Sequence, residues 1–298
     1  MLRKLTIPLN NLQRDTESVL ILGDARIIPP TKVSNASARD FYFVEPSVSK
    51  TPRRIIRSRV KPKFFLEIEA DVKEDDPETI RPVLDRALVV FKLFKNDPLL
   101  SSTVFVGDSL ERIKFEEYLY YVGDDRLSIP QYHLTADEEE EIKSFWKDYS
   151  SINTSNFAVC MFHLADFGPY LRPSFVNYVE SLEYLLVPDS DEGEIGYKFA
   201  SRGALILGER GNREETYDRL KAEYGLRSAL VHGNDRKQSE CRRKLDRLAG
   251  RTLEWNDLLS VVRCDARLAL QYFFKVGCLD RLNERRTLLR KLALGLRS

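Results

Sequence analysis

Long apolar runs and a surplus of charge of either sign are both missing from this chain of 298 residues. The N-terminal stretch MLRKLTIPLNNLQRDTESVL lacks the uninterrupted apolar core of a signal peptide, and no segment approaches the ~18 apolar residues of a membrane-spanning helix. The 47 Lys and Arg almost cancel the 46 Asp and Glu. We therefore expect a cytoplasmic protein with no membrane partner, in which any attraction to a polyanion comes from local clusters.

Histidine and cysteine are also scarce. The three histidines (His133, His163 and His232) and the four cysteines are widely spaced, without a CxxC pair or a zinc-like His spacing. This scarcity argues against a metal site, and we expect neither a metal nor a cofactor. It also directs attention to whichever histidine lies in a motif.

Residues 1–134 are expected to form an α+β N-terminal domain of unassigned role. Short β-branched and aromatic runs at 19–22, 41–44, 55–68 and 103–106 alternate with Pro, Gly, Asn and Asp. One helix is expected after Asp76 and Pro77, which suit a helix start, with its apolar stripe covering one face of the sheet.

The segment 57–69 is expected to be a single strand, because apolar and charged residues alternate along it. Pro62 cannot donate to a strand ladder and predicts an edge position or a bulge. The alternation places Arg57, Arg59, Lys61 and Lys63 on one face. Two interpretations stay open: the face binds the phosphate backbone of RNA, or it is a solvated face that discourages aggregation.

From Thr135 to residue 298 the sequence predicts an all-α helical bundle. Thr135 and Glu138 form a capping-box pattern ahead of the first helix. Polar or Gly-containing breaks separate the helices, and such short connections favour antiparallel neighbours. The expected helices span 138–149, 156–167, 173–186, 194–207, 213–232 and 254–274, and 282–296 is either a basic amphipathic helix or a frayed tail.

The informative string is YGLRSALVHG, residues 224–233. Arg227 and His232 lie five positions apart, which is ~140° around an ideal helix, so they do not point the same way. Joint action requires that the helix end near His232, for which Gly233 is a suitable stop, or that a second surface complete the site. The pair suits RNA cleavage by the 2′-hydroxyl: the imidazole exchanges protons, the guanidinium holds phosphate oxygens, and Ser228 orients.

This string resembles the motif of HEPN domains, specifically the Apea-like branch, in which an Arg and a His follow an R-x4-6-H pattern. FVNYVESLEYLL (175–186), EIGYKFASRGALILG (194–208) and the LTADEEEEIKSFW run (134–146) are similar to the same branch, so the resemblance covers about residues 135–274. It implies a metal-independent endoribonuclease, in many members a toxin or antiviral defence effector, that forms a homodimer through its motif helices.

The resemblance also implies roles for neighbouring residues. Glu183 would pair with Arg227, with an exposed helix carboxylate as the alternative, and Tyr224 would stack on an RNA base or pack in the core. The N-terminal domain would sense a trigger or restrain cutting, and an antitoxin or trigger protein is a further partner. The rival function is a catalytically silent HEPN module used for dimerisation or for docking a partner protein.

Overall fold

The computed structural model describes residues 2–39, 43–48, 55–72, 76–96, 103–107, 112–114, 132–165, 170–188, 194–208 and 213–295. The chain forms two compact units, Met1–Thr154 and Ser155–Ser298. The first unit combines a sheet with helices and the second is helical, as expected at this level of detail. The units divide after Thr154 rather than after Leu134, so helix α3 (Ala136–Tyr149) belongs to the N-terminal unit.

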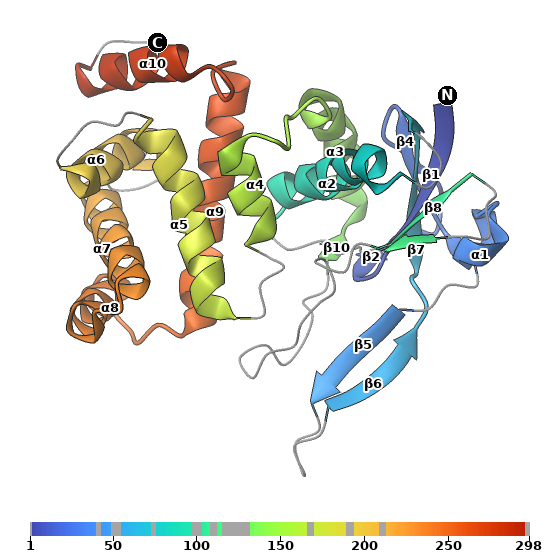
Figure 1. Cartoon of the computed structure of the whole chain (residues 1–298), viewed down its shortest axis with the longest axis horizontal. Coiled ribbons are helices and arrows are strands. Elements are labelled where there is room, and N and C mark those ends of the chain that lie inside the picture. The colour runs from blue at the N-terminus through green and yellow to red at the C-terminus, as the bar shows by residue number, and fades with distance from the viewer. Residues whose placement is uncertain are drawn as a thin grey trace. The chain divides into compact units, whose positions relative to one another are not determined.

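The N-terminal unit is built on a six-stranded antiparallel sheet (Figure 1). β7 and β1 are its central strands and pair along their full lengths. The strand order is β3 (Leu20–Ile21), β4 (Ala25–Ile28), β7 (Phe64–Asp71), β1 (Leu2–Leu9), β8 (Thr103–Val106) and β9 (Arg112–Lys114). Two smaller sheets accompany it: β2 (Leu12–Arg14) with β10 (Tyr132–Leu134), and β5 (Phe43–Val48) with β6 (Ile55–Val60).

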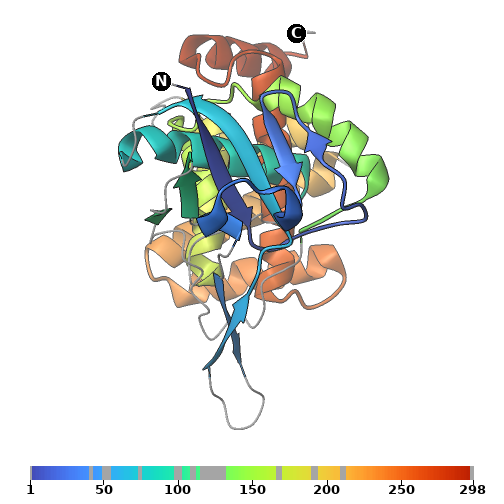
Figure 2. The ribbon, with the colours of Figure 1, turned by 90° about the vertical axis from the view of Figure 1, so that its right-hand side faces the viewer.

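Helices α2 (Pro77–Phe94) and α3 lie on the same side of the sheet (Figures 1 and 2). The Asp76 side chain caps α2 by accepting from the Glu78 N–H, and Thr135 and Glu138 form the predicted capping box of α3. Trp146 on α3 donates its Nε1–H to Asp24 at 2.9 Å and packs against Phe91 of α2. The other face is partly covered by η1 (Pro30–Lys32) and α1 (Ala36–Arg39), over a small core formed by Ile28, Val33, Ala38, Phe65 and Phe105.

The single strand expected over 57–69 is wrong. Two strands occupy this segment, and Pro62 lies between them, where the chain needs no ladder donor. Lys61 and Lys63 lie outside both strands, so the four basic residues do not share one strand face. The side chains of Arg57 and Arg59 fall outside the described part of the structure. β7 is also an interior strand, and its Glu67 is buried rather than solvated.

The C-terminal unit packs its helices around α5 (Figure 1). α5 contacts α4, α6, α7 and α9, while α8 packs on α7 and α10 on α6. Helix α8 was not expected from the sequence, and none of the described helices could cross a membrane. The helix bounds are α4 (Phe157–Leu164), α5 (Leu171–Leu186), α6 (Ile195–Leu207), α7 (Arg213–Val231), α8 (Asp235–Ala249), α9 (Trp255–Lys275) and α10 (Leu282–Ala293).

Candidate active site at the end of helix α7

Helix α7 ends one residue before His232, in the turn that Gly233 makes possible. Gly233 has a φ of +64°, the left-handed conformation that glycine adopts at little cost. The N–H of Asn234 donates to the carbonyl of Ala229 at 2.9 Å, and the N–H of Gly233 donates to that of Leu230 at 3.4 Å. This pair of bonds is the Schellman pattern, which places His232 at the C-cap. The predicted helix stop is therefore present.

Arg227 lies one turn earlier and is turned toward helix α5. Its Nη2 donates to the Glu180 carboxylate at 3.0 Å and lies 3.4 Å from the Glu183 carboxylate. The two glutamates are three positions apart, so one face of α5 presents both to the same guanidinium. The contact expected between Glu183 and Arg227 is present. Glu180 was missed, although its spacing from Glu183 was a usable signal.

The two carboxylates hold Arg227 without enclosing it. Its side chain is 19% exposed, and both ion pairs use Nη2, which leaves Nη1 without a partner among the described residues. Burial raises the pKa of Glu183; the positive charge of Arg227 opposes this rise and the negative charge of Glu180 adds to it. Glu183 therefore takes up a proton more readily than an ordinary glutamate does.

His232 and Ser228 have side chains that make no hydrogen bond within the described part of the chain. His232 is exposed, whereas Ser228 is half-buried. The backbone joins them, since the His232 N–H donates to the Ser228 carbonyl at 3.1 Å. Within one chain, Ser228 orients neither Arg227 nor His232, and Arg227 faces α5 while His232 lies at the open helix end. One chain alone therefore does not bring the side chains of Arg227, Ser228 and His232 together in a single site.

Tyr224 packs against helix α6. Its ring lies 5.3 Å from the Phe199 ring between centroids, and a methyl group added at Gly196 would come within 3.1 Å of it. Burial, with a contribution from Glu183, raises the pKa of the Tyr224 hydroxyl. This ring is part of the α6–α7 contact, and the core interpretation of Tyr224 is the one its surroundings favour.

A buried charge cluster lies two turns before Arg227 on the same helix. Arg219 donates to Glu223 at 3.0 Å and to both carboxylate oxygens of Asp265 on α9. Glu223 is 1% exposed, and its Oε2 makes no hydrogen bond. Burial raises the pKa of Glu223 to about 7, opposed by Arg219. The sequence pattern does not reveal this cluster, because Asp265 lies far from Arg219 along the chain.

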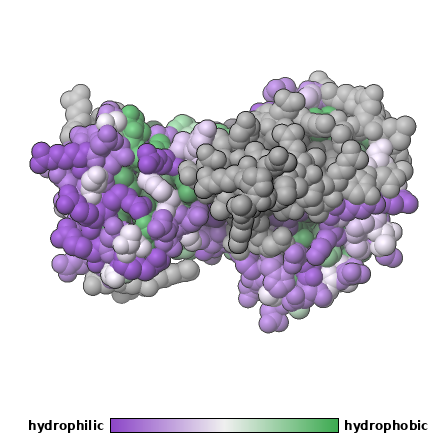
Figure 3. All heavy atoms as spheres, turned by 90° about the horizontal axis from the view of Figure 1, so that it is seen from below, coloured by the Kyte–Doolittle hydropathy of each residue, from purple (hydrophilic) through white to green (hydrophobic). Residues whose placement is uncertain are grey.

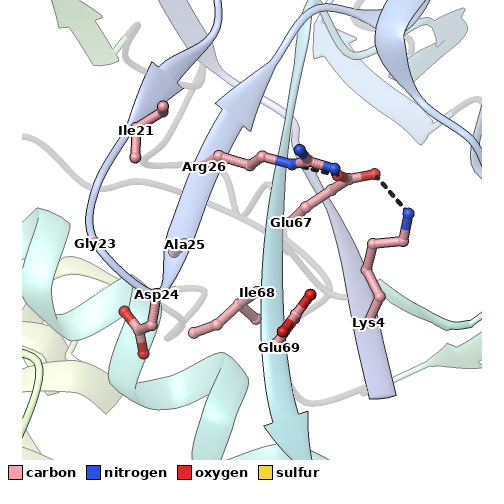
Figure 4. A pocket seen from close by; sticks show the side chains of 9 residues that line it. All are labelled: Lys4, Ile21, Gly23, Asp24, Ala25, Arg26, Glu67, Ile68 and Glu69. Carbon is pink, nitrogen blue, oxygen red and sulfur yellow. Dashed lines mark hydrogen bonds and ion pairs between the residues drawn. The ribbon is translucent and has the colours of Figure 1, made fainter. Parts of the chain in front are cut away.

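The sheet of the N-terminal unit carries an open pocket of about 350 Å³ (Figure 4). Arg26 and Lys4 reach the buried Glu67 from the two neighbouring strands, with Nη2 of Arg26 at 2.6 Å and Nζ of Lys4 at 3.8 Å. Asp24 and Glu69 also line the pocket. Because both cations already pair with Glu67, the pocket offers no unpaired positive charge to an anion.

The chemistry available at the end of α7 is proton exchange and anion contact. No group of three or more His, Cys, Asp or Glu side chains among the described residues could hold a metal ion. An exposed imidazole can take up and release protons near neutral pH, and a guanidinium with one unpaired edge can donate to an oxyanion. Comparisons with protein-family models, with curated proteins and with solved structures found no match to this chain.

Proposed function

We propose that the C-terminal unit is a metal-independent endoribonuclease of the HEPN type, acting as a toxin or as an anti-phage defence effector. One observation carries the proposal: the helix that holds Arg227 between two carboxylates ends at an exposed His232, whose side chain hydrogen-bonds none of the described residues. The resemblance of residues 224–233 to the HEPN motif supplies the family. The α5 carboxylates fit the supporting role that this resemblance gives to Glu183.

The reaction is attack by the RNA 2′-hydroxyl on the adjacent phosphorus. The 2′-oxygen–phosphorus bond forms and the bond to the 5′-oxygen breaks, leaving a 2′,3′-cyclic phosphate and a 5′-hydroxyl. His232 moves protons, because no residue in the described part of the chain hydrogen-bonds its ring and competes for them. Arg227 donates from Nη1 to the phosphorane oxygens, where charge develops in the transition state.

A second copy of the chain is needed to complete this site. Arg227 faces α5 while His232 lies at the helix end, so one chain supplies separate parts of the machinery. Val231, next to His232, is 52% exposed, and an exposed apolar residue at this position suits a contact between two copies. A two-fold axis near the ends of the α7 helices would bring the Arg227 and His232 of both chains to a shared cleft.

The test is cleavage of RNA in the presence of a chelator. Wild-type protein should release fragments ending in 2′,3′-cyclic phosphate, and His232→Ala and Arg227→Ala should lower the rate at least about a hundredfold. His133→Ala is the matched control, because it removes an exposed histidine from the N-terminal unit and should leave the rate unchanged. Thermal melts separate lost chemistry from lost folding. Cleavage that survives in His232→Ala contradicts the proposal.

The second candidate is a silent HEPN module that forms dimers or docks a partner protein. The carboxylates around Arg227 favour it, because Glu180 and Glu183 together outweigh one guanidinium and repel phosphate. A dimer that leaves RNA intact from pH 5 to pH 8 would support this candidate. Growth arrest on expression, lost in Arg227→Ala, would support the nuclease instead.

A further inference from the structure

Helix α8 presents a stripe of arginines on the side away from its packing contact. Its 15 residues include six basic and three acidic side chains, and Leu245 is its buried residue. Arg236, Arg243 and Arg247 are spaced by seven and four positions, which places them within about 40° of one another and opposite Leu245. All three are exposed. We call these three residues the α8 stripe.

The arginines of the α8 stripe are weakly engaged by the protein. Arg243 and Arg247 each donate only from Nε, to the carbonyls of Ser239 and Arg243, and their Nη groups make no hydrogen bond or ion pair with the described residues. Arg236 is 91% exposed and pairs with Glu240 at the surface. Arg251 in the same unit differs, because its two Nη groups form a bidentate ion pair with the Asp257 carboxylate. Unpaired guanidinium forks are suited to phosphate oxygens.

The α8 stripe begins beside the proposed catalytic residue. Arg236 follows His232 by four positions, and the intervening turn is fixed by the Gly233 and Asn234 hydrogen bonds. From Arg236 to Arg247 the helix rises about 16 Å, a length that spans several phosphates of an extended strand. Figure 3 views the end of the helical unit at which α8 lies, and the described surface there is largely hydrophilic.

We propose that the α8 stripe binds the phosphate backbone of single-stranded RNA and leads the strand to His232. The inference rests on the proposed nuclease function and names the surface that holds its substrate. Charge complementarity selects the occupant: the chain has a net charge of only +1, yet this face concentrates three arginines against one carboxylate.

The test is binding of a fluorescein-labelled 20-nucleotide uridine RNA, measured by anisotropy in the full-length His232→Ala chain, which should not cut. The triple change Arg236→Gln, Arg243→Gln, Arg247→Gln should raise Kd at least about tenfold. It should also reduce the slope of log K against log salt by about 2, because each phosphate contact to a single strand contributes about 0.7. Melting curves should match those of the parent, since all three side chains are exposed.

The matched control removes three cations from α10 and its N-cap residue, Arg281; this helix lies at the other end of the unit in Figures 1 and 2. Arg281→Gln, Arg290→Gln, Lys291→Gln makes the same change in net charge and should alter Kd less than about twofold. If both triple variants bind the RNA equally weakly, the effect is one of net charge alone, and the proposal is overturned. A parent that binds an acidic protein but no RNA would also overturn it.

The two proposals fail separately. If the otherwise wild-type chain cuts RNA at an unchanged rate and affinity without the α8 stripe, the stripe proposal is wrong and the nuclease stands. If the stripe governs binding but the wild-type chain never cuts, the nuclease proposal is wrong and the binding surface stands.

Discussion

Each of two arginines on α7 is held by a pair of carboxylates, and the two sites differ in burial. The difference lies in the carboxylates: Glu180 and Glu183 beside Arg227 are 27% and 25% exposed, whereas Glu223 and Asp265 beside Arg219 are 1% and 9% exposed. Two buried carboxylates that are both ionised beside the single guanidinium of Arg219 leave a net negative charge out of water, which is unfavourable. Proton uptake by Glu223 relieves that cost.

The stability of the helical unit should therefore fall as pH rises toward neutrality. The pKa of Glu223 is raised from 4.5 to about 7, so between these values the folded chain binds a proton that the unfolded chain does not. Its contribution to stability is complete below pH 4.5 and is lost as pH rises through 7, by about 3 kcal/mol at most.

Glu223→Gln should remove this pH dependence, because the amide keeps an acceptor for Arg219 and cannot ionise. We expect urea unfolding, followed by circular dichroism, to give similar stabilities at pH 4.5 and a more stable variant at pH 8. Glu215→Gln, an exposed change on the same helix, is the control and should follow wild type. If the wild-type chain instead gains stability relative to Glu223→Gln as the pH rises from 4.5 to 8, the predicted direction of the pH dependence is wrong.

At the scale of the element, the turn after α7 sets where His232 lies. Gly233→Ala should cost about 1 kcal/mol, because a side chain disfavours a φ of +64°, and should lower Tm by about 3 °C. Gly250→Ala is the matched control: it has a φ of +66° at the end of α8, and an added methyl group meets open space at both positions. Both variants should lose similar stability, as measured by calorimetry.

Only Gly233→Ala should also lower RNA cleavage, because only that turn carries the proposed catalytic imidazole. Equal cleavage by the two variants, at equal stability, would mean that the turn does not position His232.

The elements that could be predicted from sequence are those with strong local signals. The start of α2 at Asp76 and Pro77, the capping box at Thr135 and the stop at Gly233 each depend on residues within one turn. Helix α8 was missed because it buries Leu245 alone and shows no apolar stripe, although Asn234 caps it. The segment 57–69 was read as one strand because apolar and charged residues alternate on both sides of Pro62.

In the candidate site, too, the residues that could be predicted are those with a local sequence signal. Glu183 was found through the resemblance of residues 175–186 to the HEPN branch, whereas Glu180, one turn earlier on the same face of α5, was not singled out by that resemblance. The alternation in 57–69 does not reveal that Glu67 is buried, because β4 and β1 bring Arg26 and Lys4 to it from distant parts of the sequence. Contacts between segments far apart in the chain depend on packing that the sequence pattern does not encode.

At the scale of the whole molecule, the position of α3 decides where one unit ends. Its buried residues Ile142, Trp146 and Tyr149 belong to the N-terminal unit, where Trp146 bonds Asp24 and Glu139 pairs with Arg14 at 2.8 Å. The helical unit has a separate core around α5, with Phe175, Leu182 and Leu185 fully buried. Each unit thus has the apolar interior that independent folding needs.

A fragment of residues 155–298 should therefore fold alone, with cooperative thermal unfolding and native near-ultraviolet circular dichroism. A fragment of residues 135–298 is the matched comparison, because it adds α3 without the sheet that buries Trp146 and Ile142. Those side chains would then face water, so this fragment should bind a hydrophobic dye more strongly and aggregate at lower concentration. A longer fragment that is the more stable and less dye-binding of the two would place α3 in the helical unit. If the shorter fragment alone also cuts RNA, then the sheet-bearing unit is dispensable for the chemistry, which leaves sensing or restraint as its role.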